Sequence, residues 1–102
     1  MVKEIIWSHK AKIKLYSILE FYANRNGNKK YSAKLYKRFN KEIKLLIKNP
    51  LLGIETSKAN VRGLVVLDFI IFYEPNKTQI IVHTIWQTHQ NPDKLPQEIS
   101  GG

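Results

Sequence analysis

The sequence predicts an α+β fold in which an antiparallel helical hairpin packs on one face of a small, mostly antiparallel sheet, in the order β-α-α-β-β-β. Three observations support this fold class. A run rich in β-branched and aromatic residues covers 61–92, two stretches with helical periodicity cover 9–24 and 32–49, and a short apolar strand opens the chain at 2–7.

The run over 61–92 divides into three consecutive strands, because Gly63, Asp68 and the turn at 75–77 interrupt it. The breaks are too short for a parallel return, which needs a crossover of about a dozen residues or more. We therefore expect an antiparallel meander.

The middle strand of this meander is apolar on both faces. Phe69, Ile71 and Tyr73 share one face by the two-residue period, and Ile70 and Phe72 share the other. We expect the helices to cover one face and a partner or the chain's own tail to cover the second, at least in part.

Each helix has an apolar stripe at steps of three and four residues. Ser8 is predicted to cap the first helix, a turn follows at 26–28, and Pro50 and Gly53 are predicted to stop the second helix. The first stripe is Ala11, Leu15, Ile18, Leu19 and Tyr22, and the second is Tyr36, Phe39, Ile43, Leu46 and Ile47.

The length of 102 residues predicts one domain, which we place at 1–96 with a flexible tail at 97–102. No cysteine is present, so thiolate metal sites and disulfides are excluded. The three histidines have no metal-binding spacing, and we expect no metal and no cofactor. We also expect no signal peptide and no membrane span, and a cytoplasmic location.

The net charge of +9 lies almost entirely in the first half of the chain, where 13 Lys or Arg stand against 3 acids in residues 1–50. One basic stripe recurs along the second helix, away from its apolar side. It is either a solvated face or a surface for phosphate or an acidic partner. Its members are Lys34, Lys37, Lys41, Lys44 and Lys48.

Several short motifs occur in order along nearly the whole chain. They are Trp7-Ser8-x-x-Ala11, Tyr22, Asn49-Pro50-x-x-Gly53, Val61-Arg62, Ile71-Phe72-Tyr73-Glu74 and Trp86-x-x-x-Gln90-Asn91-Pro92. On these motifs the chain resembles the RelE/ParE superfamily of toxins from type II toxin-antitoxin systems, which also act in plasmid stabilisation. The resemblance implies a RelE/ParE-like fold and a growth-inhibiting toxin. It also implies a cognate antitoxin, with which the toxin can form a hetero-oligomer.

The superfamily divides by target, and the resemblance leaves two open. RelE-type members cut ribosome-bound mRNA without a metal, as mRNA interferases, whereas ParE-type members poison DNA gyrase. In the nuclease branch an arginine often sits in the middle strand and another just past the last strand; here those positions are Ile70 and His89. If this chain is a nuclease, its catalytic candidates are Arg62, His89 and Lys58.

Each singled-out residue also has a structural interpretation. Arg62 can pair with Glu74 or Asp68, His83 is expected to be satisfied within the sheet, and Trp7 and Trp86 are expected in the core or at a partner. A basic DNA-binding module without toxicity is the remaining alternative. It would not need three apolar strands behind its basic helix.

Overall fold

The computed structural model describes residues 3–88 and contains two long helices that pack against one face of a five-stranded sheet. The elements are β1 (Glu4–Trp7), α1 (His9–Asn26), α2 (Lys30–Lys48), β2 (Ile54–Glu55), β3 (Arg62–Val66), β4 (Phe69–Pro75) and β5 (Gln79–Gln87). The predicted order and fold class are confirmed, with β2 as an addition. The expected domain boundary at 96 and the tail at 97–102 lie outside the described residues.

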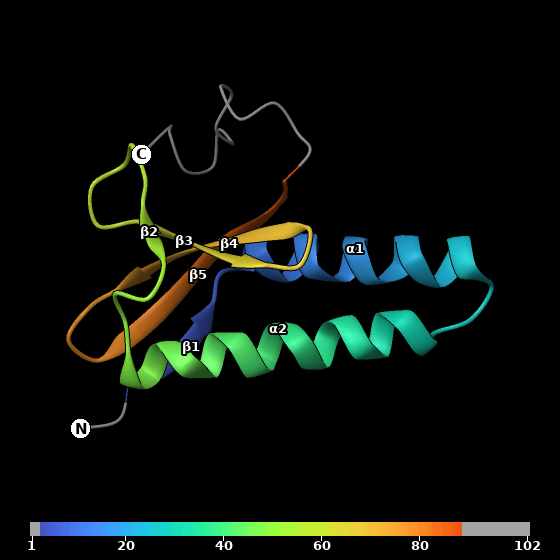
Figure 1. Cartoon of the computed structure of the whole chain (residues 1–102), viewed down its shortest axis with the longest axis horizontal. Coiled ribbons are helices and arrows are strands. Elements are labelled where there is room, and N and C mark those ends of the chain that lie inside the picture. Colours follow the sequence, from blue (N-terminus) through green and yellow to red (C-terminus); the bar gives the residue numbers. More distant parts are fainter. Residues whose placement is uncertain (1–2, 89–102) are drawn as a thin grey trace.

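The sheet has the order β1-β5-β4-β3-β2 (Figure 1). The meander of β3, β4 and β5 is antiparallel as predicted, and β1 pairs with the first half of β5 in parallel. The strand that the sequence did not predict is β2, whose two residues pair with Arg62 and Gly63. A two-residue strand shows no alternation of its own, so only its neighbour reveals it.

Local interactions fix both ends of α1 and the start of α2. The Ser8 hydroxyl accepts a bond from the Ala11 N–H (3.0 Å) and donates one to the His83 carbonyl (3.0 Å), which confirms the predicted cap and joins α1 to β5. Gly27 ends the helix in the left-handed conformation at φ 71°. The Lys30 N–H donates to the Asn28 side chain (3.0 Å), so α2 begins two residues earlier than expected.

The main core lies between the helices and one face of β4, and this face carries Phe69, Ile71 and Tyr73. Phe39 is fully buried in it and its ring meets Phe69 edge to face. One member of the predicted α2 stripe is wrong: Tyr36 is 45% exposed, and Leu35 is buried instead. Leu35 lies nearer the middle of the arc that Phe39 and Leu46 define, whereas Tyr36 lies on its flank, over the groove between the helices.

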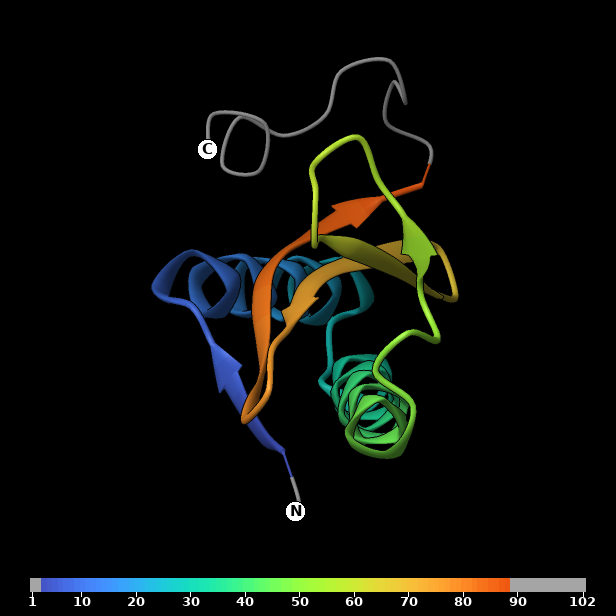
Figure 2. The same ribbon diagram turned by 90° about the vertical axis from the view of Figure 1, so that its left-hand side faces the viewer.

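The second face of the sheet carries a smaller cluster of Phe72, Trp86 and Val61, with Ile70 against it. We expected a partner or the tail to cover this face. The chain between β2 and β3 passes over part of it, seen beside the sheet away from the helices in Figure 2, and brings in Val61, which is 2% exposed. The tail lies outside the described residues. Trp7 packs against the main core and Trp86 belongs to the second cluster, so both tryptophans are structural as expected.

Candidate functional site

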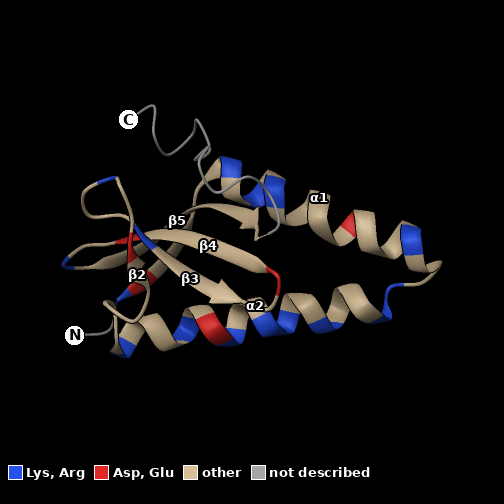
Figure 3. Cartoon of the chain, turned by 45° about the horizontal axis from the view of Figure 1, so that its top comes forward, with Lys and Arg blue, Asp and Glu red and all other residues tan. Residues whose placement is uncertain are grey.

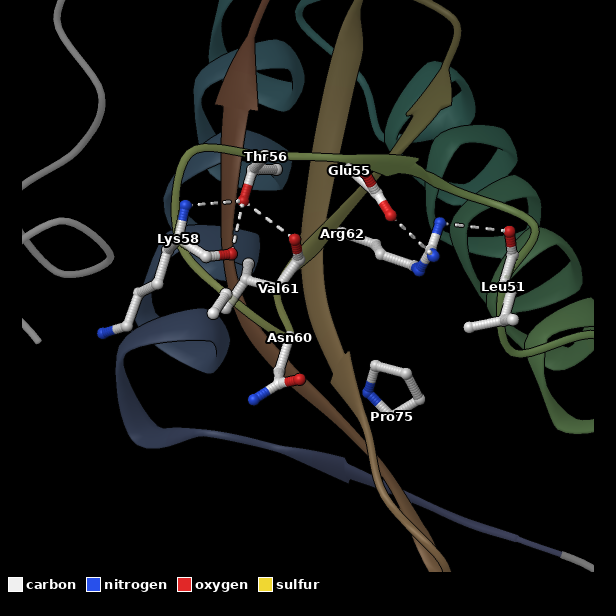
Figure 4. A pocket seen from close by; sticks show the side chains of 9 residues that line it. Leu51, Glu55, Thr56, Lys58, Asn60, Val61, Arg62 and Pro75 are labelled. Atoms are coloured by element: carbon white, nitrogen blue, oxygen red, sulfur yellow. Dashed lines mark hydrogen bonds and ion pairs between the residues drawn. The ribbon is translucent and has the colours of Figure 1, made fainter.

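A cavity of about 410 Å³ lies where the β2–β3 loop meets the sheet (Figure 4), and it contains two of the predicted catalytic residues, Arg62 and Lys58. The remaining lining residues come from the segment after α2, from the loop and from the end of β4. They are Leu51, Glu55, Thr56, Ala59, Asn60, Val61 and Pro75.

The loop that forms the cavity wall is organised by the Thr56 hydroxyl. This hydroxyl shares its one proton between the carbonyls of Val61 (2.8 Å) and Lys58 (3.1 Å), and it accepts from the Lys58 N–H (3.3 Å). Asn60 then turns the chain with φ 69°, a conformation that asparagine tolerates better than most residues. The loop is therefore held by its own polar groups while Val61 anchors it to the sheet.

Arg62 is bound to the protein on several sides. Its Nη1 donates to the carbonyls of Gly53 (2.8 Å) and Leu51 (3.4 Å), and its Nη2 lies 3.6 Å from a carboxylate oxygen of Glu55. The predicted partners, Glu74 and Asp68, are wrong. Glu55 takes their place because β2 puts it directly opposite Arg62 in the sheet register.

Tyr73 binds both Pro50 and Gly53. Its hydroxyl donates to the Pro50 carbonyl (2.8 Å) and accepts from the Gly53 N–H (2.8 Å), so it fastens the segment after α2 to the middle of the sheet. Burial raises the pKa of this hydroxyl, while the Gly53 N–H and the Arg62 charge act in the opposite direction. A Cβ on Gly53 would lie 2.7 Å from Tyr73 Cε1, so only glycine fits.

Of the three predicted catalytic residues, the structure describes Arg62 and Lys58, whose charged groups do not converge. The Lys58 side chain extends away from the Arg62 guanidinium, with Val61 between them in Figure 4. His89 lies outside the described residues. Ile70, at the position where the nuclease branch often has arginine, packs against Phe72 and Trp86 on the second face of the sheet. The cavity therefore contains the Arg62 guanidinium, which is hydrogen-bonded to carbonyls, and the Lys58 ammonium, which points away from it.

The fold and the cavity can be set beside those of known proteins. A search of curated proteins finds no match. A family model described as "ParE toxin of type II toxin-antitoxin system, parDE" matches residues 5–92, which is most of the chain. The chain belongs to the ParE toxin family. The predicted membership of the RelE/ParE superfamily is thereby confirmed, and a cognate antitoxin follows from belonging to a toxin-antitoxin system.

A solved structure titled "Chromosomal ParDE TA system from P. aeruginosa" supports the fold of this ParE toxin. The two chains superpose with a TM-score of 0.74 at 18% sequence identity, over 86% of this chain and 98% of that one. At this identity the likeness shows the fold alone.

One further feature of the ParE toxin agrees with what the sequence predicted. His83 Nε2 lies 3.0 Å from a carboxylate oxygen of Glu74, so the histidine is satisfied within the sheet as expected. In addition, no helix among the described residues is long and apolar enough to cross a membrane.

Every member of the α2 lysine stripe (Lys34, Lys37, Lys41, Lys44 and Lys48) is exposed. The stripe follows the side of α2 opposite the buried Phe39 and Leu46, and Figure 3 shows basic residues along much of this helix. The nearest acidic group on the helix, Glu42, pairs with Arg38 at 4.0 Å. Exposure agrees both with a solvated face and with a binding surface, and neither interpretation is tested by the geometry.

The sequence pointed to Arg62 and Lys58, but it did not indicate Thr56, the pairing of Glu55 with Arg62 or the role of Tyr73. For Tyr73 the sequence offered one indication, the motif Asn49-Pro50-x-x-Gly53 in a chain whose middle strand contains a tyrosine. The hydroxyl of this tyrosine holds the motif to the sheet. Thr56 had no such sign, because its hydrogen bonds reach only two and five residues along an irregular loop.

Proposed function

We propose that this ParE toxin inhibits growth in the cytoplasm by poisoning DNA gyrase, and that an antitoxin encoded beside it neutralises it. Membership of the ParE family supports this target over the ribosome. The alternative, a metal-independent ribosome-dependent endoribonuclease of the RelE type, remains the competing hypothesis, and the cavity at Arg62 is where its chemistry would have to occur.

The observation that carries the proposal is the engagement of Arg62. Cleavage of RNA at the 2′-hydroxyl needs a base, a group that stabilises charge on the phosphate, and an acid for the leaving oxygen. The Nη1 of Arg62 already donates to two carbonyls and its Nη2 lies beside the Glu55 carboxylate, so a phosphate would have to compete with that carboxylate for the remaining N–H groups. Ile70 offers no charge in its place. Gyrase poisoning requires no such set of groups.

The expected result for His89→Ala is that toxicity persists. In induced cells, primer extension should show full-length transcripts, and an assay for broken DNA should show gyrase-dependent breaks. A nuclease that used His89 would instead lose on the order of 10² to 10³ in rate. Lys58→Ala serves as a second variant, because Lys58 holds the loop through its backbone rather than its side chain.

Ribosome-dependent cuts that vanish with His89→Ala would refute the gyrase proposal. Arg62→Ala is the less informative variant, since removing its bonds to Gly53 and Leu51 is expected to disturb the fold whatever the target is.

We further propose that the α2 lysine stripe contacts nucleic-acid phosphate at the target. Replacing Lys37, Lys41 and Lys44 with glutamine should then flatten the dependence of duplex DNA binding on salt, by roughly one unit of log–log slope for each lysine that binds a phosphate. The measurement is a titration at several salt concentrations. An unchanged slope would leave the stripe as a solvated face that serves solubility.

A further inference from the structure

A second basic surface runs along α1, on the side that faces away from α2. Lys10, Lys14, Ser17, Phe21 and Arg25 follow one another at steps of four, three, four and four residues, so they share one stripe of the helix. The single acid of α1, Glu20, lies on another side, in the groove between the helices. This stripe therefore carries cations and an aromatic ring without a carboxylate among them.

Two neighbouring cavities lie along this stripe, between α1 and the second half of β5. One, of about 380 Å³, is lined by Lys14, Phe21 and Arg25 together with Gln87 at the end of β5. The other, of about 270 Å³, is lined by Lys10 and Lys14 and reaches Thr84. Lys14 and Ser17 belong to both, so the two cavities form one continuous trough. β1 pairs only with the first half of β5, which leaves room for the trough beside the second half.

Phe21 is the unusual member of the trough. Its side chain is 54% exposed, and the neighbouring Tyr22 meets it edge to face at 5.1 Å between ring centroids. Tyr22 turns inward toward Phe69, so Phe21 is left to present its ring to the solvent between Lys14 and Arg25. An exposed aromatic ring between cations is the arrangement that proteins use to stack bases while holding the phosphates.

We propose that this α1 trough binds single-stranded nucleic acid. Lys10, Lys14 and Arg25 hold the phosphates, Phe21 stacks on one base, and Ser17 and Gln87 supply polar contacts to base or sugar. Lys14 and Arg25 are eleven residues apart, about 16 Å at a rise of about 1.5 Å per residue, so a segment of a few nucleotides spans them. The site is independent of the proposed gyrase target and lies on a different helix from the α2 lysine stripe.

The experiment is a fluorescence anisotropy titration of the purified full-length chain. The probes are a labelled oligo(dT) strand of about 12 nucleotides and the matching oligo(dA)·oligo(dT) duplex, each at several salt concentrations. Phe21→Ala should weaken single-strand binding about 5- to 100-fold without changing the salt slope. The double variant Lys14→Gln, Arg25→Gln should reduce the slope by about 1.4, since each phosphate contact on a single strand contributes about 0.7.

Matched controls come from the other sides of the same helix. Tyr16 is 63% exposed and lines the groove toward α2, and Lys12 is exposed away from the trough. Tyr16→Ala and Lys12→Gln should leave oligo(dT) binding within about twofold of the wild type. The melting temperature of each variant checks its fold, and if the double variant melts early, Arg25→Gln alone replaces it because Arg25 is exposed.

Three outcomes would overturn the proposal. Equal losses for Phe21→Ala and Tyr16→Ala would show that no particular ring stacks on a base. A duplex that binds as tightly as the strand and responds to Phe21→Ala by the same factor would exclude single-strand recognition. The third outcome is a competition result in which an acidic, phenylalanine-containing peptide displaces labelled oligo(dT) at a lower concentration than unlabelled oligo(dT) needs. That result would assign the trough to a protein partner instead.

Discussion

Replacing Gly53 with alanine should destabilise the toxin by about 3 kcal/mol or more. The added Cβ would lie 2.7 Å from Tyr73 Cε1, 2.8 Å from the Tyr73 hydroxyl and 2.8 Å from the Gly63 carbonyl. Tyr73 is fully buried and cannot swing aside, and moving the backbone would break its bonds to Pro50 and Gly53. For a small domain this loss is a large share of the total stability. Urea denaturation would measure it.

Gly27 provides the matched control for this glycine. Its φ of 71° disfavours alanine, but a Cβ there would meet nothing within 4 Å. Gly27→Ala should therefore cost only about 1 to 2 kcal/mol, from the left-handed conformation. Equal losses at the two positions would mean that the clash with Tyr73 adds nothing beyond backbone conformation, and the steric explanation for Gly53 would be wrong.

Phe39→Ala should cost about 3 to 5 kcal/mol, the usual range for deleting a fully buried phenylalanine. Phe39 links the inner side of α2 to Phe69 of β4 and has no solvent contact, so its removal leaves a cavity between helix and sheet. Leu15→Ala, at 4% exposure on α1, should cost about 2 to 5 kcal/mol for the same reason. The midpoint of chemical denaturation reports both losses.

The control for this pair is Phe21→Ala, which removes the same side chain from a site that is 54% exposed. Its effect on stability should stay at about 1.5 kcal/mol or less, the usual contribution of an aromatic pair such as that with Tyr22. Wild-type-like unfolding of Phe39→Ala, or an equal loss for Phe21→Ala, would contradict the packing of α2 on the sheet.

The meander and both helices could be predicted because each carries its periodicity within its own segment. The faces of β4 followed from alternation alone. The turns followed from Gly27, Asp68 and the stretch 75–77, although Pro75 itself is the last residue of β4. The predictions that were wrong concern side chains whose burial or partner is decided by contacts between segments. Leu35 and Tyr36 are adjacent and both apolar, so choosing the buried one requires the position of the sheet.

The candidate site was predictable in content and only partly in arrangement. Arg62 and Lys58 lie beside the meander by sequence, and the structure places both at one cavity. The partner of Arg62 could not be predicted, since Glu55 becomes its neighbour only through a two-residue strand. Glu74, one of the expected partners, lies opposite Ile81 in the pairing of β4 with β5. Its carboxylate contacts His83 and not Arg62.

The parallel pairing of β1 with β5 has a consequence for how the toxin is made. Glu4 lies opposite Gln79, and the Ser8 hydroxyl donates to the His83 carbonyl. Both β1 and the cap of α1 therefore need β5, the last of the described strands, for these contacts. A nascent chain has neither contact until β5 has been synthesised, and loops closed over such long sequence separations form late. A transcript broken before the codons of β5 therefore yields a polypeptide in which β1 has no strand to pair with, and we expect such a fragment to be harmless.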